Sequence, residues 1–225
     1  MMDKKKLLSK GLTKYIAGLI LVMLLLFIPA GTLRYSGGWL FIALLFIPML
    51  IMGFVLIRKD PALLEKRLNA KETQSEQKGV VAVSGIMFLA GFILAGLDHR
   101  FGWTSIPGWA VAAGAVLFLG GYLMYAEVMR ENSYLSRTVE VQSGQKVIDT
   151  GLYGIVRHPM YTATILMFLA MPVILGSLVS LAVFLIYPVV IVRRIGNEEE
   201  VLEKGLEGYA EYKKKVKYRL LPFIW

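Results

Sequence analysis

The sequence predicts an all-α, polytopic integral membrane protein: four transmembrane helices, a C-terminal apolar helical hairpin and a cytosolic amphipathic C-terminal helix. Three observations predict this class. Of the 225 residues, 56% are hydrophobic, a share too high for an ordinary soluble domain. The apolar residues gather in runs of roughly 20, the length that a helix needs to cross a bilayer. All 25 lysines and arginines except Arg34 and Arg100 fall on one side of these helices, so both termini are expected in the cytoplasm.

The first four apolar runs are residues 15–33, 39–57, 80–97 and 109–129. A basic lead with five lysines precedes them. Between the second and third runs, Pro61–Leu68 has the pattern of a short amphipathic helix. Asp98, His99 and Arg100 follow the third run and are expected in a loop. Residues 1–129 are therefore expected to form an N-terminal region of transmembrane helices.

Residues 130–225 are expected to form a second region, which carries the chemistry. It opens with a long polar connection, in which residues 138–148 form either a small hairpin or an irregular excursion. Two apolar arms follow, residues 162–175 and 178–192. Each arm of about 15 residues would be roughly 22 Å long as a helix, against a hydrocarbon core of about 30 Å. The chain thus has about six spans, and the sequence leaves open whether both arms cross the whole bilayer.

One polar stretch before the hairpin, residues 151–161, has the pattern of a ligand site. Pro159 suits the first turn of a helix, and the preceding His158 is pushed toward extended geometry. A helix N-terminus can hold an anion such as a ligand carboxylate. Arg157 and His158 stand at that point, and Tyr153 and Tyr161 flank it. Alternatively, Arg157 and His158 only mark the membrane surface where a helix enters.

A second polar stretch follows the hairpin and holds three consecutive glutamates. Asn197 is expected to cap a helix whose first turn contains them. Glu198, Leu202, Leu206 and Tyr209 are spaced to share one face of that helix. The glutamates can accept hydrogen bonds from a diol or an ammonium group of a ligand. The alternative is an amphipathic helix that lies on the membrane.

Composition excludes several function classes. The chain has no cysteine, which rules out disulfides and thiolate metal sites. Its two histidines, His99 and His158, lie near no metal-ligand spacing, so no metal is expected. The net charge of +9 is typical of membrane proteins with basic cytoplasmic loops, and no nucleic-acid partner is expected. Ionisable residues are absent from the middle of the spans, which argues against an ion transporter.

The two polar stretches together resemble a known family. The first reads Gly151-x-Tyr153-x-x-Val156-Arg157-His158-Pro159-x-Tyr161, and the second Glu198-Glu199-x-x-Leu202 followed by Tyr209-x-x-Tyr212. With Asn132-x-Tyr134-x-Ser136 upstream, this pattern resembles the isoprenylcysteine carboxyl methyltransferases, which belong with the membrane-embedded phospholipid methyltransferases. The resemblance covers residues 129–225, whereas the first four spans match only in kind.

The resemblance implies S-adenosylmethionine as the methyl donor, bound on the cytosolic side. It implies a donor pocket formed by both stretches, with these expected cofactor-binding residues: Tyr153, Val156, Arg157, His158, Pro159, Tyr161, Glu198, Glu199 and Tyr209. A carboxylate acceptor needs an arginine to orient it, and Arg157, Arg193 and Arg194 are candidates. An amine acceptor needs a base, such as Glu127 or a tail glutamate. The expected catalytic residues are Arg157, Arg194 and Glu199.

The expected reaction is carboxyl O-methylation of an isoprenylcysteine-like or other lipophilic acceptor that enters from the bilayer, with membrane lipids as the other partners. The first alternative is a phospholipid or amine N-methyltransferase. A second is a membrane reductase, because sterol reductases have a similar C-terminal half, although no G-x-G-x-x-G fingerprint follows a strand. A third is a membrane protein without enzymatic activity. The sequence does not determine the oligomeric state.

Overall fold

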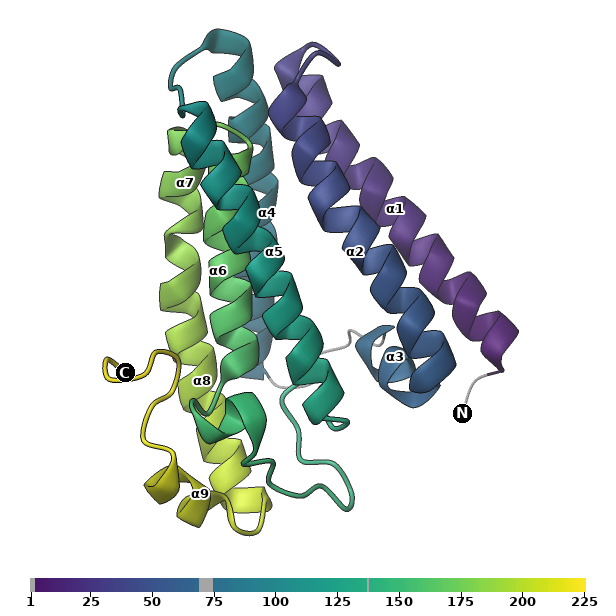
Figure 1. The fold of residues 1–225 in the computed structure, drawn as a ribbon, viewed down its shortest axis with the longest axis vertical. Helices are drawn as coiled ribbons and strands as arrows, with labels where there is room; N and C mark the ends of the chain where they lie inside the picture. Colours follow the sequence, from purple (N-terminus) through teal and green to yellow (C-terminus); the bar gives the residue numbers. More distant parts are fainter. Residues whose placement is uncertain (1–2, 69–74, 137) are drawn as a thin grey trace.

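The computed structural model of this chain describes residues 3–68, 75–136 and 138–225, and its regular elements over these ranges are all helical. The elements are α1 Lys4–Ala30, α2 Ser36–Lys59, α3 Pro61–Leu68, α4 Ser75–Phe101, α5 Gly108–Glu131, the 3₁₀ helix η1 Gly151–Gly154, α6 Pro159–Ile174, α7 Leu178–Phe184, α8 Ile186–Gly205 and α9 Tyr209–Lys215 (Figure 1). The predicted all-α class is therefore confirmed. Arg137 and Lys71, which the count of basic residues included, lie outside the described ranges.

Five segments in the described ranges are long and apolar enough to cross a membrane: Lys4–Ala30, Ser36–Lys59, Gln77–Phe101, Gly108–Glu131 and Leu178–Gly205. The last of them combines α7 and α8, which are separated only by Leu185. The two helices are distinct because Pro188, in the first turn of α8, has no N–H to continue the ladder from α7. α6 is apolar but shorter, with 16 residues. The polytopic membrane architecture is confirmed, with unequal hairpin arms.

The N-terminal region differs from the expectation at two helix ends. α1 begins at Lys4, so the basic lead is part of the first helix. Asp98, His99 and Arg100 belong to the last turns of α4 instead of a loop. Asp98 holds this end because its carboxylate accepts hydrogen bonds from the backbone N and Oγ1 of Thr104 and from Ser177 Oγ.

The C-terminal region also differs from the expectation. Asn197 was expected to cap a new helix, but it lies inside α8, which runs unbroken from Ile186 to Gly205. Its Oδ1 accepts a hydrogen bond from Gln77 Nε2 at 2.6 Å instead of capping. The expected C-terminal amphipathic helix is thus divided between the end of α8 and the short α9. Residues 138–148 form no strand, so the irregular alternative is correct.

Close helix packing brings α5 against α6, the helix that follows the first polar stretch. A Cβ at Gly121 of α5 would lie 2.6 Å from Met167 Cγ and 3.0 Å from the carbonyl oxygen of Ala163. Only glycine allows this approach, as is common between membrane helices.

The turns after α1, α4 and α6 lie at one end of the molecule (Figure 1). The N-terminus, α3, the connection after α5 and α9 lie toward the other end, which holds the site.

Candidate functional site

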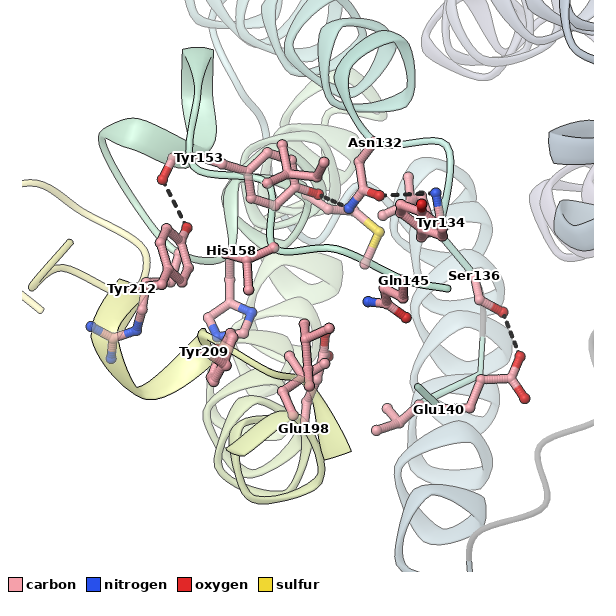
Figure 2. Close-up of a pocket in the computed structure, with 18 of the residues that line it drawn as sticks. Asn132, Tyr134, Ser136, Glu140, Gln145, Tyr153, His158, Glu198, Tyr209 and Tyr212 are labelled. Atoms are coloured by element: carbon pink, nitrogen blue, oxygen red, sulfur yellow. Dashed lines mark hydrogen bonds between the residues drawn. The ribbon is translucent and has the colours of Figure 1, made fainter. Parts of the chain in front are cut away.

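A pocket with about 850 Å³ of empty space, part of it open to solvent, lies between the connection after α5, the entrance to α6, and α8 and α9. Figure 2 shows Asn132, Tyr134, Ser136 and Gln145 on one side of it and Tyr209 and Tyr212 on the other. The pocket therefore brings together segments that are more than 60 residues apart in the chain.

Gly151, the first residue of the polar stretch 151–161, has to be a glycine for a steric reason. Gly151 has a φ of +50°, and a Cβ there would overlap the carboxylate of Glu131. That carboxylate accepts a hydrogen bond from the backbone N–H of Leu152 at 3.1 Å, which anchors the start of η1. The turn places Tyr153 in the pocket wall, where its hydroxyl accepts from Asn132 Nδ2 and its backbone carbonyl accepts from the Tyr212 hydroxyl.

α6 begins at Pro159, as the sequence predicts, and His158 before it is non-helical, with φ −125° and ψ 58°. The backbone amides of Arg157 and His158 donate to the carbonyls of Tyr218 and Arg219, both at 2.9 Å. The entrance to α6 is thus paired with the C-terminal segment of the chain. This pairing brings the Arg219 side chain beside α8.

Glu199 is buried where these segments meet, with 2% of its surface exposed. Its Oε1 accepts hydrogen bonds from Arg157 Nε at 2.7 Å and lies 3.2 Å from His158 Nε2. Its Oε2 accepts from the Arg219 guanidinium at 3.0 and 3.1 Å, and Lys213 Nζ is 3.6 Å away. Buried charges need such partners. Glu199 therefore holds the α6 entrance, α8 and the C-terminal segment together.

Glu198, its neighbour, has a different environment. It is only partly buried, lines the pocket, and accepts a hydrogen bond from the Tyr161 hydroxyl through Oε2. Arg194 Nε in turn donates to the Tyr161 hydroxyl at 2.7 Å. The three side chains form a hydrogen-bonded row along the pocket wall, so one turn of α8 presents both a cation and an anion to a ligand.

Tyr209 provides the most direct sign of a ligand. It is 4% exposed and lines the pocket, yet its buried hydroxyl has no hydrogen-bond partner in the described part of the chain. Burial, with the nearby charges of Glu199 and Glu198, raises the pKa of Tyr209, so the hydroxyl stays neutral. Because an unpaired buried hydroxyl is costly, a polar ligand atom is the natural partner for it.

The structure brings most of the residues predicted from the sequence to this pocket. Those that line it are Tyr153, Arg157, His158, Tyr161, Arg194, Glu198 and Tyr209. Val156, Pro159 and Glu199 are buried behind it and are not among its lining residues. Arg193 is exposed. Glu127, the possible base, pairs with Arg130 at the end of α5.

The sequence analysis did not assign to the pocket the segment between α5 and η1, residues 132–150, which forms one wall of it and is called the pocket wall below. Its pocket-lining residues include Ser136, Thr138, Glu140, Gln145 and Lys146. The Asn132-x-Tyr134-x-Ser136 pattern is the sequence signal for this wall, because Asn132, Tyr134 and Ser136 all line the pocket. Together, the wall and the two motifs offer aromatic faces, two carboxylates, two guanidinium groups and several amides and hydroxyls. Such a set can bind a ligand that has a flat ring, hydroxyls and charges of both signs.

Two comparisons with known proteins bear on this site. Residues 109–207, from α5 to just beyond α8, match the family model described as phospholipid methyltransferase. A segment of 91 residues, 39% of the chain, is 31% identical to Delta(14)-sterol reductase of Mus musculus and takes in 22% of that protein. The chain thus matches about a fifth of the length of this relative. The chain is thus a membrane protein in which residues 109–207 are similar to the phospholipid methyltransferase family and a segment is similar to a sterol reductase.

Proposed function

We propose that this protein is an S-adenosylmethionine-dependent methyltransferase of the membrane, and that the pocket beside α8 binds the methyl donor. The observation that carries the proposal is the pocket itself. Residues from the part that matches the methyltransferase family model line most of it. Tyr209 lines it, with a buried hydroxyl that has no hydrogen-bond partner among the described residues. Phospholipid methyltransferases transfer the methyl group of S-adenosylmethionine, so the family match also favours this donor.

The residues present fit the donor's chemistry. Glu198 is a candidate to accept hydrogen bonds from the ribose diol or the ammonium group, and Tyr209 has a hydroxyl to offer. Tyr153, Tyr161 and Tyr209 are aromatic surfaces for the adenine. When bound, the donor supplies an electrophilic methyl group on a sulfonium. The protein contributes alignment of the acceptor and exclusion of water.

The favoured acceptor is a lipophilic carboxylate, such as an isoprenylcysteine-like group, that reaches the pocket from the bilayer. A carboxylate is already ionised at neutral pH, so it needs an orienting cation and no general base. Arg194 is the better placed of the predicted arginines, because it lines the pocket beside Tyr161. Arg157 is committed to Glu199 and to the carbonyls of Val216 and Lys217. In the alternative reaction, with an amine acceptor, Glu198 is the tail glutamate that lines the pocket and would act as the base.

The pocket belongs on the cytosolic side in this proposal, with both termini. The supporting observation concerns Arg34 and Arg100, the two basic residues outside the cytosolic set. Arg34 lies in the turn after α1 and Arg100 in the last turn of α4, at the end of the molecule far from the pocket. Cytosolic S-adenosylmethionine would then reach the pocket directly. Single-cysteine labelling of this cysteine-free chain at Ser143 and Ser105 measures the orientation. Labelling of Ser143 from outside the cell would contradict it.

A second candidate function is a reductase that uses a nicotinamide cofactor, because part of the chain is 31% identical to a sterol reductase. Isothermal calorimetry of the purified protein with S-adenosylhomocysteine and, separately, NADPH distinguishes the two. We expect binding of S-adenosylhomocysteine and none of NADPH. Binding of NADPH alone would favour the reductase, and binding of neither would reject both uses of the pocket.

A further inference from the structure

The short helix α3 contacts the donor pocket, although it lies outside the segment that matches the family model. Two of its cations donate to backbone carbonyls in the pocket wall. Arg67 Nη1 bonds the carbonyl of Ser136 at 3.1 Å, and Lys66 Nζ bonds that of Ser133 at 3.2 Å. Ser136 lines the pocket. α3 therefore touches the wall close to where the ligand would lie.

Apolar packing supports the same contact. Leu63 of α3 is 2% exposed and belongs to a buried cluster with Val128, Met129, Leu135 and Tyr153. Leu135 and Tyr153 also line the pocket. The Arg67 guanidinium lies over the ring of another member of this region, Tyr125, at 5.4 Å from its centroid. One face of α3 thus packs against residues that line the pocket.

The wall needs support from outside because residues 132–150 form no helix or strand over the described positions. Several of its hydrogen bonds are internal, such as those from Gln142 Nε2 to the Tyr134 carbonyl and from the Tyr134 hydroxyl to the Gly144 carbonyl. Such bonds shape the segment, and Val141 and Val147 pack on the cluster of Leu206 and Tyr209 at the end of α8 and the start of α9. The bonds from Arg67 and Lys66 tie the first part of the segment, at Ser133 and Ser136, to α3.

We propose that α3 is a working part of the donor site, with Arg67 as the residue that positions the pocket wall. This inference rests on the proposed function. Arg67 holds the Ser136 carbonyl through a charged hydrogen bond and rests on Tyr125. Loss of that bond lets the Ser136 part of the wall shift in the pocket, while Val141 and Val147 still pack on the cluster that holds Tyr209. Donor binding weakens as a result, although Arg67 itself does not line the pocket.

Calorimetry with S-adenosylhomocysteine tests this on Arg67→Ala, Arg67→Lys and a control, Arg58→Ala, which removes an exposed cation at the end of α2. We expect Arg67→Ala to raise the Kd roughly threefold to tenfold with an unchanged stoichiometry, since a charged hydrogen bond is lost. Arg67→Lys restores most of the affinity because it keeps a donor. Arg58→Ala binds as the wild type does.

A merely structural role for Arg67 would lower the stoichiometry and the unfolding temperature but leave the Kd unchanged, and this result would overturn the inference. A Kd for Arg67→Lys as high as that for Arg67→Ala would do the same. If Arg67→Ala does not fold, Lys66→Ala provides the same test at a more exposed contact. Failure of the wild type to bind S-adenosylhomocysteine would instead reject the proposed function.

Discussion

The two ends of the helical bundle each hold a buried carboxylate, and the two are satisfied differently. Asp98, at the end with the short turns, is 1% exposed and accepts hydrogen bonds from neutral donors of Thr104 and Ser177. Glu199, at the other end, is 2% exposed and is bound by the side chains of Arg157, His158 and Arg219. Both carboxylates join segments that are far apart in the sequence.

The different surroundings of the two carboxylates indicate a structural role for the Asp98 end and a ligand-binding role for the Glu199 end. The partners of Asp98 complete its hydrogen bonds and link α4 to the turn before α7. Around Glu199, cations outnumber the buried carboxylate, and the pocket opens beside it with an unpaired hydroxyl on Tyr209. We therefore expect substitutions at the Asp98 end to change stability alone. Those at the Glu199 end should change stability, ligand binding or both, according to whether the side chain lies behind the pocket or lines it.

The largest effect is expected from Glu199→Ala. The substitution leaves Arg157 and His158 buried without their anion, which costs roughly 3–5 kcal/mol of stability. Thermal unfolding in detergent should show a large fall in unfolding temperature, together with loss of S-adenosylhomocysteine binding. Glu199→Gln keeps the shape and is the matched control, with a smaller loss. An unfolding temperature equal to that of the wild type would show that Glu199 does not hold these segments together.

Asp98→Ala is expected to cost about 2–4 kcal/mol, because the buried hydroxyl of Ser177 and the partly buried donors of Thr104 lose their acceptor. The unfolding temperature should fall clearly. The folded fraction should bind S-adenosylhomocysteine with the affinity of the wild type, because the site lies at the other end of the bundle. A weaker affinity in this variant would contradict the claim that substitutions at the Asp98 end leave ligand binding unchanged.

Glu198→Gln should have the reverse profile. Stability changes little, since the side chain is only partly buried and the Tyr161 hydroxyl keeps an acceptor. Affinity for S-adenosylmethionine should fall about fivefold to tenfold, because the amide keeps an acceptor but loses the charge, which strengthens a hydrogen bond by about 1–1.5 kcal/mol. Glu200→Ala removes the neighbouring exposed carboxylate and should bind normally. Normal binding by Glu198→Gln would leave Glu198 with a purely structural role.

Tyr209→Phe removes the unpaired hydroxyl and should have opposite effects on the free and bound protein. Without ligand, the free energy of unfolding should stay the same or rise by up to about 1 kcal/mol, because the penalty of burying that hydroxyl disappears. Affinity for the donor should fall by about fivefold. Competitive calorimetry and thermal unfolding measure the two quantities. A destabilised free protein would mean that the hydroxyl already has a partner.

The smallest effect is expected from pH. Burial raises the pKa of Tyr153 to about 12, so this pocket tyrosine stays neutral in the physiological range. A carboxylate acceptor is fully ionised above about pH 5. The methyl-transfer rate should therefore change less than about twofold between pH 6.5 and 8.5. A rate that climbs steeply with pH, with an alkali-stable N-methyl product, would assign an amine acceptor instead.

Local chemistry in the sequence predicted the start of α6, because Pro159 fixes its own φ and lacks an N–H. It did not predict the start of α8. The polar residues around Asn197 resembled a helix cap, but Gln77 and the partners of Glu199 satisfy that stretch within a continuous helix. Propensity alone cannot distinguish a cap from a polar turn that tertiary contacts stabilise.

The sequence predicted those residues of the candidate site that belong to the two motifs. Its remaining parts depend on tertiary proximity. Arg219 reaches Glu199 only because the α6 entrance pairs with the C-terminal segment. Arg67 reaches Ser136 only because α3 packs under the connection after α5. The separation of Glu198, in the pocket, from Glu199, behind it, follows from the orientation of α8, which the spacing of two adjacent residues leaves undetermined.

The measurement that tests the account most directly is photo-crosslinking of labelled S-adenosylmethionine to the purified protein, followed by peptide mapping. The account predicts label on peptides from residues 132–161 or 194–212, with protection by S-adenosylhomocysteine and none by NADPH. Label confined to α1–α4, protection by NADPH, or no specific label would contradict the assignment of this pocket to the methyl donor.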